Sequence, residues 1–284
     1  MDTVIQSRSR TVTIGPNQPF CIIGERINPT GRKAFQKQLQ AGDLSQLEID
    51  VAEQVALADV LDVNVGDPLA DEIGLMGMAI PLVQDLTDLP LCIDSSIIEA
   101  LDAGLAAYEG KALVNSVTGE DERLEAILPI VARHGAAVIG LANAEDIPME
   151  PERRLEVARK IISVAGDYGI PPEDVMIDPL AMPVGAEPRA VTLFVETVRL
   201  IREHLGVNMT CGASNTSFGL PGRHTLGGAF LAIASSHGLT SAIMDARSVE
   251  SVEAVRAADF LLGHDEWGTR WIAAFRAKKA ASAA

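Results

Sequence analysis

Short apolar segments alternate with longer amphipathic segments along the whole chain. The short segments are β-branched or otherwise apolar and show no regular alternation of polar and apolar positions. That pattern is typical of strands buried on both faces of a parallel sheet. The predicted strands are Cys21–Gly24, Val60–Val65, Leu91–Ile93, Ala112–Asn115, Ala137–Leu141, Val175–Ile177, Asn208–Cys211 and Ala242–Met244.

The segments between the predicted strands carry apolar residues at helical spacing. Clear stripes occupy residues 47–58, 124–131, 155–165 and 191–201. Pro81 lies inside the apolar run after Ile73 and predicts a helix that is kinked or split there. Thr225 to Met244 is the least charged long stretch, and its glycines, serines and histidine favour a helix followed by a strand over a membrane span. Asp265 to Phe275 is typical of a further terminal helix.

Eight strands, each followed by a helix, give about 33 residues per unit, which is the size of a βα unit. Eight such units close into a barrel, so the predicted fold class is α/β, a single (β/α)8 TIM barrel. A doubly wound open sheet is the alternative, which is less favoured because no GxGxxG follows the first predicted strand. Residues 1–19 are then an N-terminal extension, and residues 20–284 form one barrel domain with an extra C-terminal helix.

The charge balance of the chain excludes some classes of partner. The chain has 23 Lys and Arg against 39 Asp and Glu, a net charge of −16. This argues against sequence-independent binding of nucleic acid and against anionic membrane surfaces. It leaves room for a small anionic ligand held by a few local cations. Residues 1–18 contain no apolar core of a secretory signal, so we expect a soluble, cytoplasmic protein.

Cysteines and histidines give no motif for a metal site. Cys21, Cys92 and Cys211 are far apart and odd in number, which suits a reducing compartment. We expect them to be small buried hydrophobic side chains, and a site built from all three thiolates is the alternative. The histidines fall in predicted helices or loops away from the strand ends, except that His224 is a borderline case. No HExxH, EF-hand or P-loop pattern is present, and we expect no metal bound by this chain.

Almost every predicted strand ends in an Asn, Asp or Glu. In a barrel, chemistry lies at the carboxyl ends of the strands. These residue types also cap helices, but a cap lies just before its helix, whereas several of these abut a strand directly. The residues concerned are, in chain order, Glu25, Asn28, Asn64, Asp67, Asp94, Asn115, Asn143, Asp178, Asn215 and Asp245.

Such a rim suits a neutral heteroaromatic ligand that is rich in N–H donors. A carboxylate accepts two parallel hydrogen bonds from an amino-amidine edge, as in a 2-amino-4-oxopterin or a guanine. Carboxamides satisfy an edge that mixes donors and acceptors. Because a buried polar group left unpaired costs about 1–3 kcal/mol, such a site discriminates sharply between ligands.

Six short motifs occur in the order that is found in a known family. They are Gly24–Asn28, Asp62–Gly66, Cys92–Ser95, Val114–Ser116, Ile177–Leu180 and Gly212–Ser217. By these motifs the chain resembles the methyltetrahydrofolate:corrinoid protein methyltransferases, within the pterin-binding TIM barrels that include dihydropteroate synthases and the folate domain of cobalamin-dependent methionine synthase. The resemblance covers nearly all of residues 20–275.

The resemblance implies a role for each matching position. Asp94, Asn115 and Asp178 would hold the pterin ring by its amino, amide and ring-nitrogen edge. Asn215 would act as the catalytic residue by bonding to the ring nitrogen that carries the methyl group. The other positions expected in the cavity are Gly212 and Ser214 in its floor, Arg223 near the pterin, and Glu25, Asn28 and Asn64 along its wall.

The resemblance also implies the substrates and partners. The substrate would be methyltetrahydrofolate or tetrahydrofolate, and cobalamin, a corrinoid, would carry the methyl group on a partner protein, because no DxHxxG cobalt-ligand loop is present in this chain. Phe218 stands where corrinoid iron–sulfur members carry a polar amide, which argues against an acetogenic corrinoid iron–sulfur protein as the partner. The family implies a homodimer.

Methyl transfer would proceed in line between nitrogen and cobalt. Asn215 would accept a hydrogen bond from the protonated nitrogen, and solvent would supply the proton. The direction is open, and in demethylation the methyl group would pass from the methyl-corrinoid protein to tetrahydrofolate. One alternative is a dihydropteroate synthase-like pterin condensation, with Arg26, Arg32 and Lys33 for a pyrophosphate leaving group. Another alternative is a non-catalytic folate-binding subunit.

Overall fold

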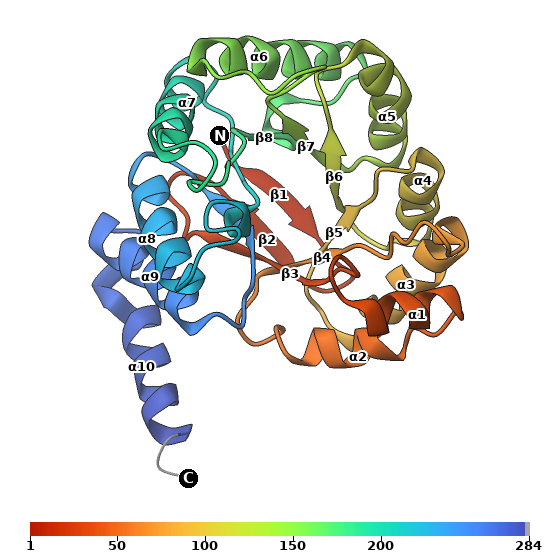
Figure 1. The fold of residues 1–284 in the computed structure, drawn as a ribbon, viewed down its shortest axis with the longest axis horizontal. Coiled ribbons are helices and arrows are strands. Elements are labelled where there is room, and N and C mark those ends of the chain that lie inside the picture. Colours follow the sequence, from red (N-terminus) through yellow and green to blue (C-terminus); the bar gives the residue numbers. More distant parts are fainter. Residues whose placement is uncertain (282–284) are drawn as a thin grey trace.

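A curled parallel sheet forms the centre of the computed structural model, which describes residues 1–281. Figure 1 shows the sheet surrounded by helices. Its order is β8-β7-β6-β5-β4-β3-β9, so neighbours in space are neighbours in sequence except where β9 returns to β3. The strands are β3 (Cys21–Ile27), β4 (Val60–Val63), β5 (Leu91–Asp94), β6 (Leu113–Val117), β7 (Ala137–Leu141), β8 (Val175–Asp178) and β9 (Ser241–Met244).

The predicted strand Asn208–Cys211 is the exception, and the regular sheet has seven strands rather than eight. This segment and the residue that follows it make isolated parallel bridges, from Met209 to Ile177 on one side and from Gly212 to Ile243 on the other. The hydroxyl of Thr240 accepts from the N–H of Met209 and donates to its carbonyl, and the Ser241 hydroxyl donates to the same carbonyl. The Met209 carbonyl also accepts from the backbone N–H of Ser241 at 3.1 Å, so side chains and backbone together join this segment to β9 without a regular strand pair.

Helices follow the strands as the apolar stripes predict. The stripes 124–131, 155–165 and 191–201 lie in α5, α6 and α7, whereas the stripe 47–58 is helical only as far as Ala52. Pro81 does not split its helix, because α3 runs without a break from Glu72 to Leu86. The helices are α1 (Lys33–Gln40), α2 (Ser45–Ala52), α3 (Glu72–Leu86), α4 (Ile98–Ala107), α5 (Asp121–His134), α6 (Pro151–Asp167), α7 (Ala190–His204), α8 (Arg223–Ser236), α9 (Val249–Leu262) and α10 (Thr269–Ala281), and short 3-10 turns lie at η1 (Pro172–Asp174), η2 (Ala213–Asn215) and η3 (Glu266–Gly268).

The apolar core has two parts. The larger cluster fills the space between the sheet and its helices, and a smaller cluster fills the inside of the curled sheet. Cys21 and Cys92 belong to the inner cluster and Cys211 to the outer one, and all three are buried free thiols, as the sequence predicts. Within residues 1–281, no helix is long and apolar enough to cross a membrane.

The N-terminal extension forms a β-hairpin that closes one end of the sheet. Its strands are β1 (Thr3–Gln6) and β2 (Thr11–Ile14), and the fully buried Ile5 and Ile14 join the inner cluster. Gln6 exchanges two backbone hydrogen bonds of 2.9 Å with Lys111, which lies just before β6. The hairpin therefore lies at the amino-terminal ends of the strands, and the opposite end is left for a site.

We expect Asn208→Ala to lower the free energy of unfolding by about 1–3 kcal/mol, because buried acceptors lose their donor. The Asn208 amide donates to the Thr3 hydroxyl at 2.9 Å and to the Ile14 carbonyl at 2.8 Å. Denaturant unfolding measures the change. Asn17→Ala, an exposed position in the same extension, is the control and should leave the stability within about 0.5 kcal/mol. Equal stability of the two variants would show that the hairpin is not fastened through Asn208.

Candidate active site

A cavity of about 460 Å³ opens at the carboxyl ends of the strands. The family resemblance implies ten site positions, and eight of them line this cavity, including the four expected around the pterin. The predicted residues that line it are Glu25, Asn28, Asp94, Asn115, Asp178, Gly212, Asn215 and Arg223. They come from β3, β5, β6 and β8, from the segment after Cys211, and from the start of α8.

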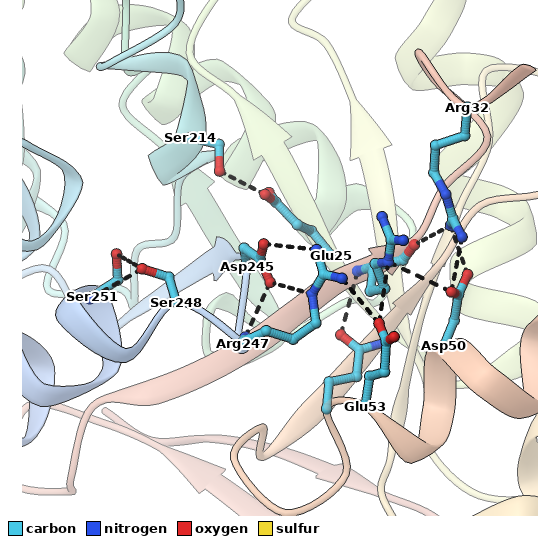
Figure 2. Close-up of polar contacts among 11 residues, drawn as sticks. Glu25, Arg32, Asp50, Glu53, Ser214, Asp245, Arg247, Ser248 and Ser251 are labelled. Atoms are coloured by element: carbon cyan, nitrogen blue, oxygen red, sulfur yellow. Dashed lines mark hydrogen bonds and ion pairs between the residues drawn. The ribbon is translucent and has the colours of Figure 1, made fainter. Parts of the chain in front are cut away.

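The remaining two predicted residues, Asn64 and Ser214, lie behind this lining and contact it. The Asn64 amide donates to the Asp94 carboxylate at 2.9 Å, and its oxygen accepts from the N–H of Gly66 at 2.8 Å. The Ser214 hydroxyl donates to the Glu25 carboxylate at 2.5 Å (Figure 2). Both residues therefore orient an acidic side chain that faces the cavity.

Asp62 is a site residue that the sequence reasoning missed. It lies within β4, is only 2% exposed, and lines the cavity. Its carboxylate accepts from the Asn115 amide at 3.2 Å and meets the carboxyl of Asp94. The sequence does contain a signal for Asp62. An acidic residue between the apolar residues of a buried strand needs a polar partner, which indicates a site.

Asp62 and Asp94 form a buried pair of neighbouring carboxyl groups. Burial and the adjacent carboxylate of Asp94 raise the pKa of Asp62 well above its usual range. Burial also raises the pKa of Asp94, to about 6, although the hydrogen bonds from Asn64 and Asp62 oppose the rise. Burial thus disfavours the charged form of both carboxyl groups, and more strongly that of the more deeply buried Asp62.

Asp178 is a further carboxyl group of the cavity whose pKa is raised. Burial raises its pKa to about 6, against the stabilising backbone N–H groups of Leu180 and Gly212 and the charge of Arg154. The Leu180 N–H lies 2.7 Å from this carboxylate. Leu180 itself has a φ of 69°, which is unfavourable for a residue with a side chain, so the loop after β8 needs support.

Arg154 provides that support from α6. Its guanidinium is fully buried and donates to the carbonyls of Pro148 at 2.8 Å, Pro179 at 2.7 Å and Leu180 at 3.1 Å. The sequence reasoning missed it, because an arginine on an amphipathic helix normally faces water. It positions the loop that carries Asp178.

Gly212 and Asn215 form a small steric unit at η2. A Cβ atom on Gly212 would lie 2.9 Å from the amide nitrogen of Asn215, so a larger residue there would shift this carboxamide from its position. Asn215 lines the cavity, and within residues 1–281 its carboxamide makes no hydrogen bond to protein. It remains available to a ligand.

The arginines on the other side of the cavity are already engaged by carboxylates. Arg32 forms a two-point pair with Asp50, at 2.6 and 2.9 Å. Arg247 bonds to both oxygens of Asp245 at 2.9 Å and to Glu53 at 2.9 Å (Figure 2). These carboxylates neutralise most of the positive charge of Arg32 and Arg247, so this wall of the cavity does not form a strong site for a polyanion.

Two further positions lie next to this cavity. Phe218 follows η2 and is 68% exposed, so it forms part of the outer surface. His224 lines a neighbouring cavity of about 260 Å³ that shares Glu25, Arg223 and Asp245 with the first one. Within residues 1–281, no three His, Cys, Asp or Glu side chains are grouped as a metal site.

Taken together, the cavity can accept several N–H donors of a flat ligand. Asp94 and Asp178 provide carboxylates, and Asn115 and Asn215 provide carboxamides. Buried carboxylates that accept paired N–H groups bind an amino-amidine edge strongly and directionally. The electrostatics thus suit a neutral heterocycle of this kind.

Known proteins with similar sequences fall into two groups of enzymes. Over 265 residues the chain is 30% identical to the methylcorrinoid:tetrahydrofolate methyltransferase of Eubacterium limosum, which covers 91% of this chain and 97% of that protein. It is 31% identical over 261 residues to the methionine synthase of Mycobacterium tuberculosis, but this match covers 86% of this chain and only 22% of that longer protein.

Solved structures and a family model agree with these matches. Dihydropteroate synthase from Xanthomonas albilineans with 4-aminobenzoic acid has a TM-score of 0.67 at 19% identity, over 92% of this chain and 99% of that one. Yersinia pestis dihydropteroate synthase has a TM-score of 0.65 at 16% identity, over 93% and 100%. At these identities the likeness shows the fold. Residues 24–245 match the family model described as pterin binding enzyme. The resemblance seen in the sequence is thereby confirmed, and the chain belongs to the pterin-binding enzyme family.

Proposed function

We propose that this protein transfers a methyl group between a tetrahydrofolate ring nitrogen and the cobalt of a corrinoid that a partner protein carries. The observation that carries the proposal is the cavity in which Asp94, Asn115, Asp178 and Asn215 meet at the carboxyl ends of the strands. The match to a methylcorrinoid:tetrahydrofolate methyltransferase over nearly the full length of both chains supports it.

Three of these side chains hold the pterin ring in this proposal. Asp94 and Asp178 accept N–H groups of the amino, amide and ring-nitrogen edge, and Asn115 meets the same edge while its amide is held by Asp62. Gly212 and Ser214 shape the floor, Arg223 lies near the ring, and Glu25, Asn28 and Asn64 form or support the wall. Ligand recognition is thus assigned to carboxylates whose pKa values the fold has raised.

Asn215 acts on the reacting nitrogen. When the nitrogen lone pair attacks the methyl carbon, the electron pair of the carbon–cobalt bond returns to cobalt. The nitrogen then carries a positive charge and an N–H, which the Asn215 carboxamide oxygen accepts as a hydrogen bond. The proton afterwards leaves to solvent. The reverse reaction passes through the same transition state, so Asn215 serves both directions.

We propose that the physiological direction is from the methyl-corrinoid protein to tetrahydrofolate. The name of the Eubacterium limosum relative states this direction, and that relative has the same extent as this chain. The methionine synthases share only a fifth of their length with it. No metal or redox change on this chain is part of the proposal.

The architecture is completed by four further proposals. We propose that residues 208–211 act as the eighth strand of a closed (β/α)8 barrel, supported by the bridge from Met209 to Ile177 and by the bridge from the next residue, Gly212, to Ile243. Residues 1–19 form the N-terminal extension of a single barrel domain that spans residues 20–284. The enzyme works in the cytoplasm, and it works as a homodimer.

A condensation of the dihydropteroate synthase type is the alternative for the same pterin pocket. That reaction needs cationic side chains for a pyrophosphate leaving group. Arg26 and Arg32 are instead paired with Asp50, and Arg247 with Asp245, so among residues 1–281 Arg223 is the one arginine of the lining without a carboxylate pair. The geometry therefore favours methyl transfer.

An anaerobic spectroscopic assay tests the function. Methylcobalamin or a methyl-corrinoid protein is mixed with tetrahydrofolate, and we expect cob(I)alamin to appear only with the enzyme. The reverse mixture, cob(I)alamin with methyltetrahydrofolate, should react as well. Incubation with hydroxymethylpterin diphosphate and 4-aminobenzoate should give no dihydropteroate. Dihydropteroate formation without methyl transfer would overturn the proposal, and folate binding without either reaction would favour a non-catalytic subunit.

We expect Asn215→Ala to lower the methyl-transfer rate by about 10²-fold or more, because a hydrogen bond aimed at charge formed in the transition state is lost. Tetrahydrofolate affinity, measured by titration, should fall by less. Asn143→Ala is a matched control, since Asn143 also follows a strand, and within residues 1–281 its side-chain amide donates only to the carbonyl of Ala144. Equal losses in rate and affinity would restrict Asn215 to ground-state binding.

We expect tetrahydrofolate affinity to weaken as pH falls through about 6, approaching tenfold per pH unit for each carboxylate that must stay ionised. Asp94 and Asp178, both with a pKa of about 6, accept a pair of N–H groups on their two oxygens only when deprotonated. Isothermal titration from pH 7.5 to 5 gives the curve. Asp178→Asn should bind tetrahydrofolate weakly at pH 7.5, and its affinity should depend less on pH. The exposed Asp167→Asn should keep the affinity and the pH dependence of the wild type. An affinity independent of pH would remove the carboxylates from the binding role.

A further inference from the structure

Glu72 is a buried acidic residue that does not line the cavity. It is the first residue of α3 and is only 9% exposed. Among residues 1–281 it forms no ion pair with a lysine, an arginine or a histidine. Burying a carboxylate without a cation is costly, so this position needs partners of another kind.

The hydrogen-bond partner of Glu72 is the hydroxyl of Ser95. This hydroxyl donates to the Glu72 carboxylate and accepts from the N–H of Ile97 at 2.9 Å. Ser95 is buried and directly follows Asp94, which is the last residue of β5. Because the hydroxyl is fixed on both sides, it fastens the backbone just after Asp94 to the start of α3.

The second carboxylate oxygen of Glu72 lies close to Gly66. A Cβ atom on Gly66 would lie 3.1 Å from Oε2 of Glu72 and 3.1 Å from Oδ1 of Asn64. Glycine therefore allows both side chains to approach the backbone between β4 and α3. The Asn64 amide donates to the Asp94 carboxylate at 2.9 Å, so Glu72 is linked to the surroundings of Asp94 through Ser95 and lies beside Asn64 as well.

The charges that act on Asp94 are negative. Burial, and after it the charge of Glu72, raise the pKa of Asp94 to about 6, whereas the hydrogen bonds from Asn64 and Asp62 oppose the rise. Asp62 reaches Asp94 from β4, and Glu72 comes from α3 on the other side of the β4–α3 loop. A carboxylate close to a second one takes up a proton more readily.

The other charged groups near β5 are engaged elsewhere or face solvent. Arg123 of α5 donates to the carbonyl of Ser96 at 3.3 Å. In α4, Glu99 is exposed and Asp102 forms ion pairs with α5. The neighbouring strand β6 contains no charged residue. None of these groups offsets the negative charge at the start of α3.

We propose that Glu72, which does not touch the ligand, is a positioning residue for Asp94 in pterin recognition. Its carboxylate fastens the backbone after Asp94 through Ser95, and it places a second negative charge behind Asp94. The inference rests on the proposed function, in which Asp94 accepts N–H groups of the pterin edge. Folate affinity then responds to pH near neutrality, since a proton on Asp94 competes with the ligand.

Glu72→Gln and Glu72→Ala separate the two actions. Glutamine keeps an oxygen for the Ser95 hydroxyl and removes the charge, whereas alanine removes both. We expect Asp94 in Glu72→Gln to titrate at least about half a pH unit lower than in the wild type, because a neighbouring negative charge is lost. Carbon-13 NMR of the aspartate-labelled enzyme without folate measures this titration, and Asp94→Asn assigns the resonance.

Isothermal titration with tetrahydrofolate measures the consequence for binding. Glu72→Gln should bind as tightly as the wild type at pH 7.5 and should lose affinity at a lower pH than the wild type does. Glu72→Ala should bind about tenfold more weakly at pH 7.5, because the buried Ser95 hydroxyl loses its acceptor. Glu99→Gln, an exposed glutamate in the first turn of α4, is the matched control and should behave as the wild type.

An unmoved titration of Asp94 in Glu72→Gln overturns the inference, and so does full affinity of Glu72→Ala at pH 7.5. The near-isosteric glutamine variant decides the effect of the charge even where the alanine variant does not fold. The NMR titration needs no folate, so it separates this inference from the proposed function. A shifted Asp94 titration in an enzyme that does not bind tetrahydrofolate supports the action of Glu72 on Asp94 and overturns the proposed function alone.

Discussion

The register of the parallel strands is the constraint on which the rest of the molecule depends. Asp62 pairs in register with Cys92, and Asp94 pairs with Asn115. Cys92 belongs to the inner cluster, and side chains two residues apart in a strand share a face. Asp62, Asp94 and Asn115 therefore all point to the inside of the curled sheet. A shift of one residue would turn these polar groups into the apolar layer beneath the helices.

Placing carboxylates inside a sheet has a cost that the neighbouring groups offset. A buried charge without partners is strongly unfavourable, so each acid here has fixed donors. Asn64 and Asn115 donate to Asp94 and Asp62, and backbone N–H groups donate to Asp178. The compensation is incomplete, which is why burial still raises their pKa values. The same incomplete compensation leaves acceptor capacity for N–H donors of a ligand.

Much of this was predictable from sequence, and the failures have physical causes. Buried parallel strands and amphipathic helices are local patterns, so their positions and most strand-end residues were found. The role of Asp62 was missed because it depends on the register with the next strand. Arg154 was missed because its burial depends on carbonyls some 25 residues away in the loop after β8. The hairpin has strands of four residues, and only tertiary packing of Ile5 and Ile14 stabilises it.

The closed end and the open end of the sheet are physically linked. Ile5 and Ile14 of the hairpin fill the same inner cluster as Cys92, and Asp62 lies beside Cys92 in register. By excluding water from below, the hairpin keeps the floor of the cavity at low polarity. Desolvation is the largest cause of the raised pKa of Asp62 and of Asp94. The hairpin at the amino-terminal ends of the strands therefore contributes to the raised pKa values of these cavity residues. An extension that looks dispensable in the sequence is therefore part of the environment in which the cavity binds its ligand.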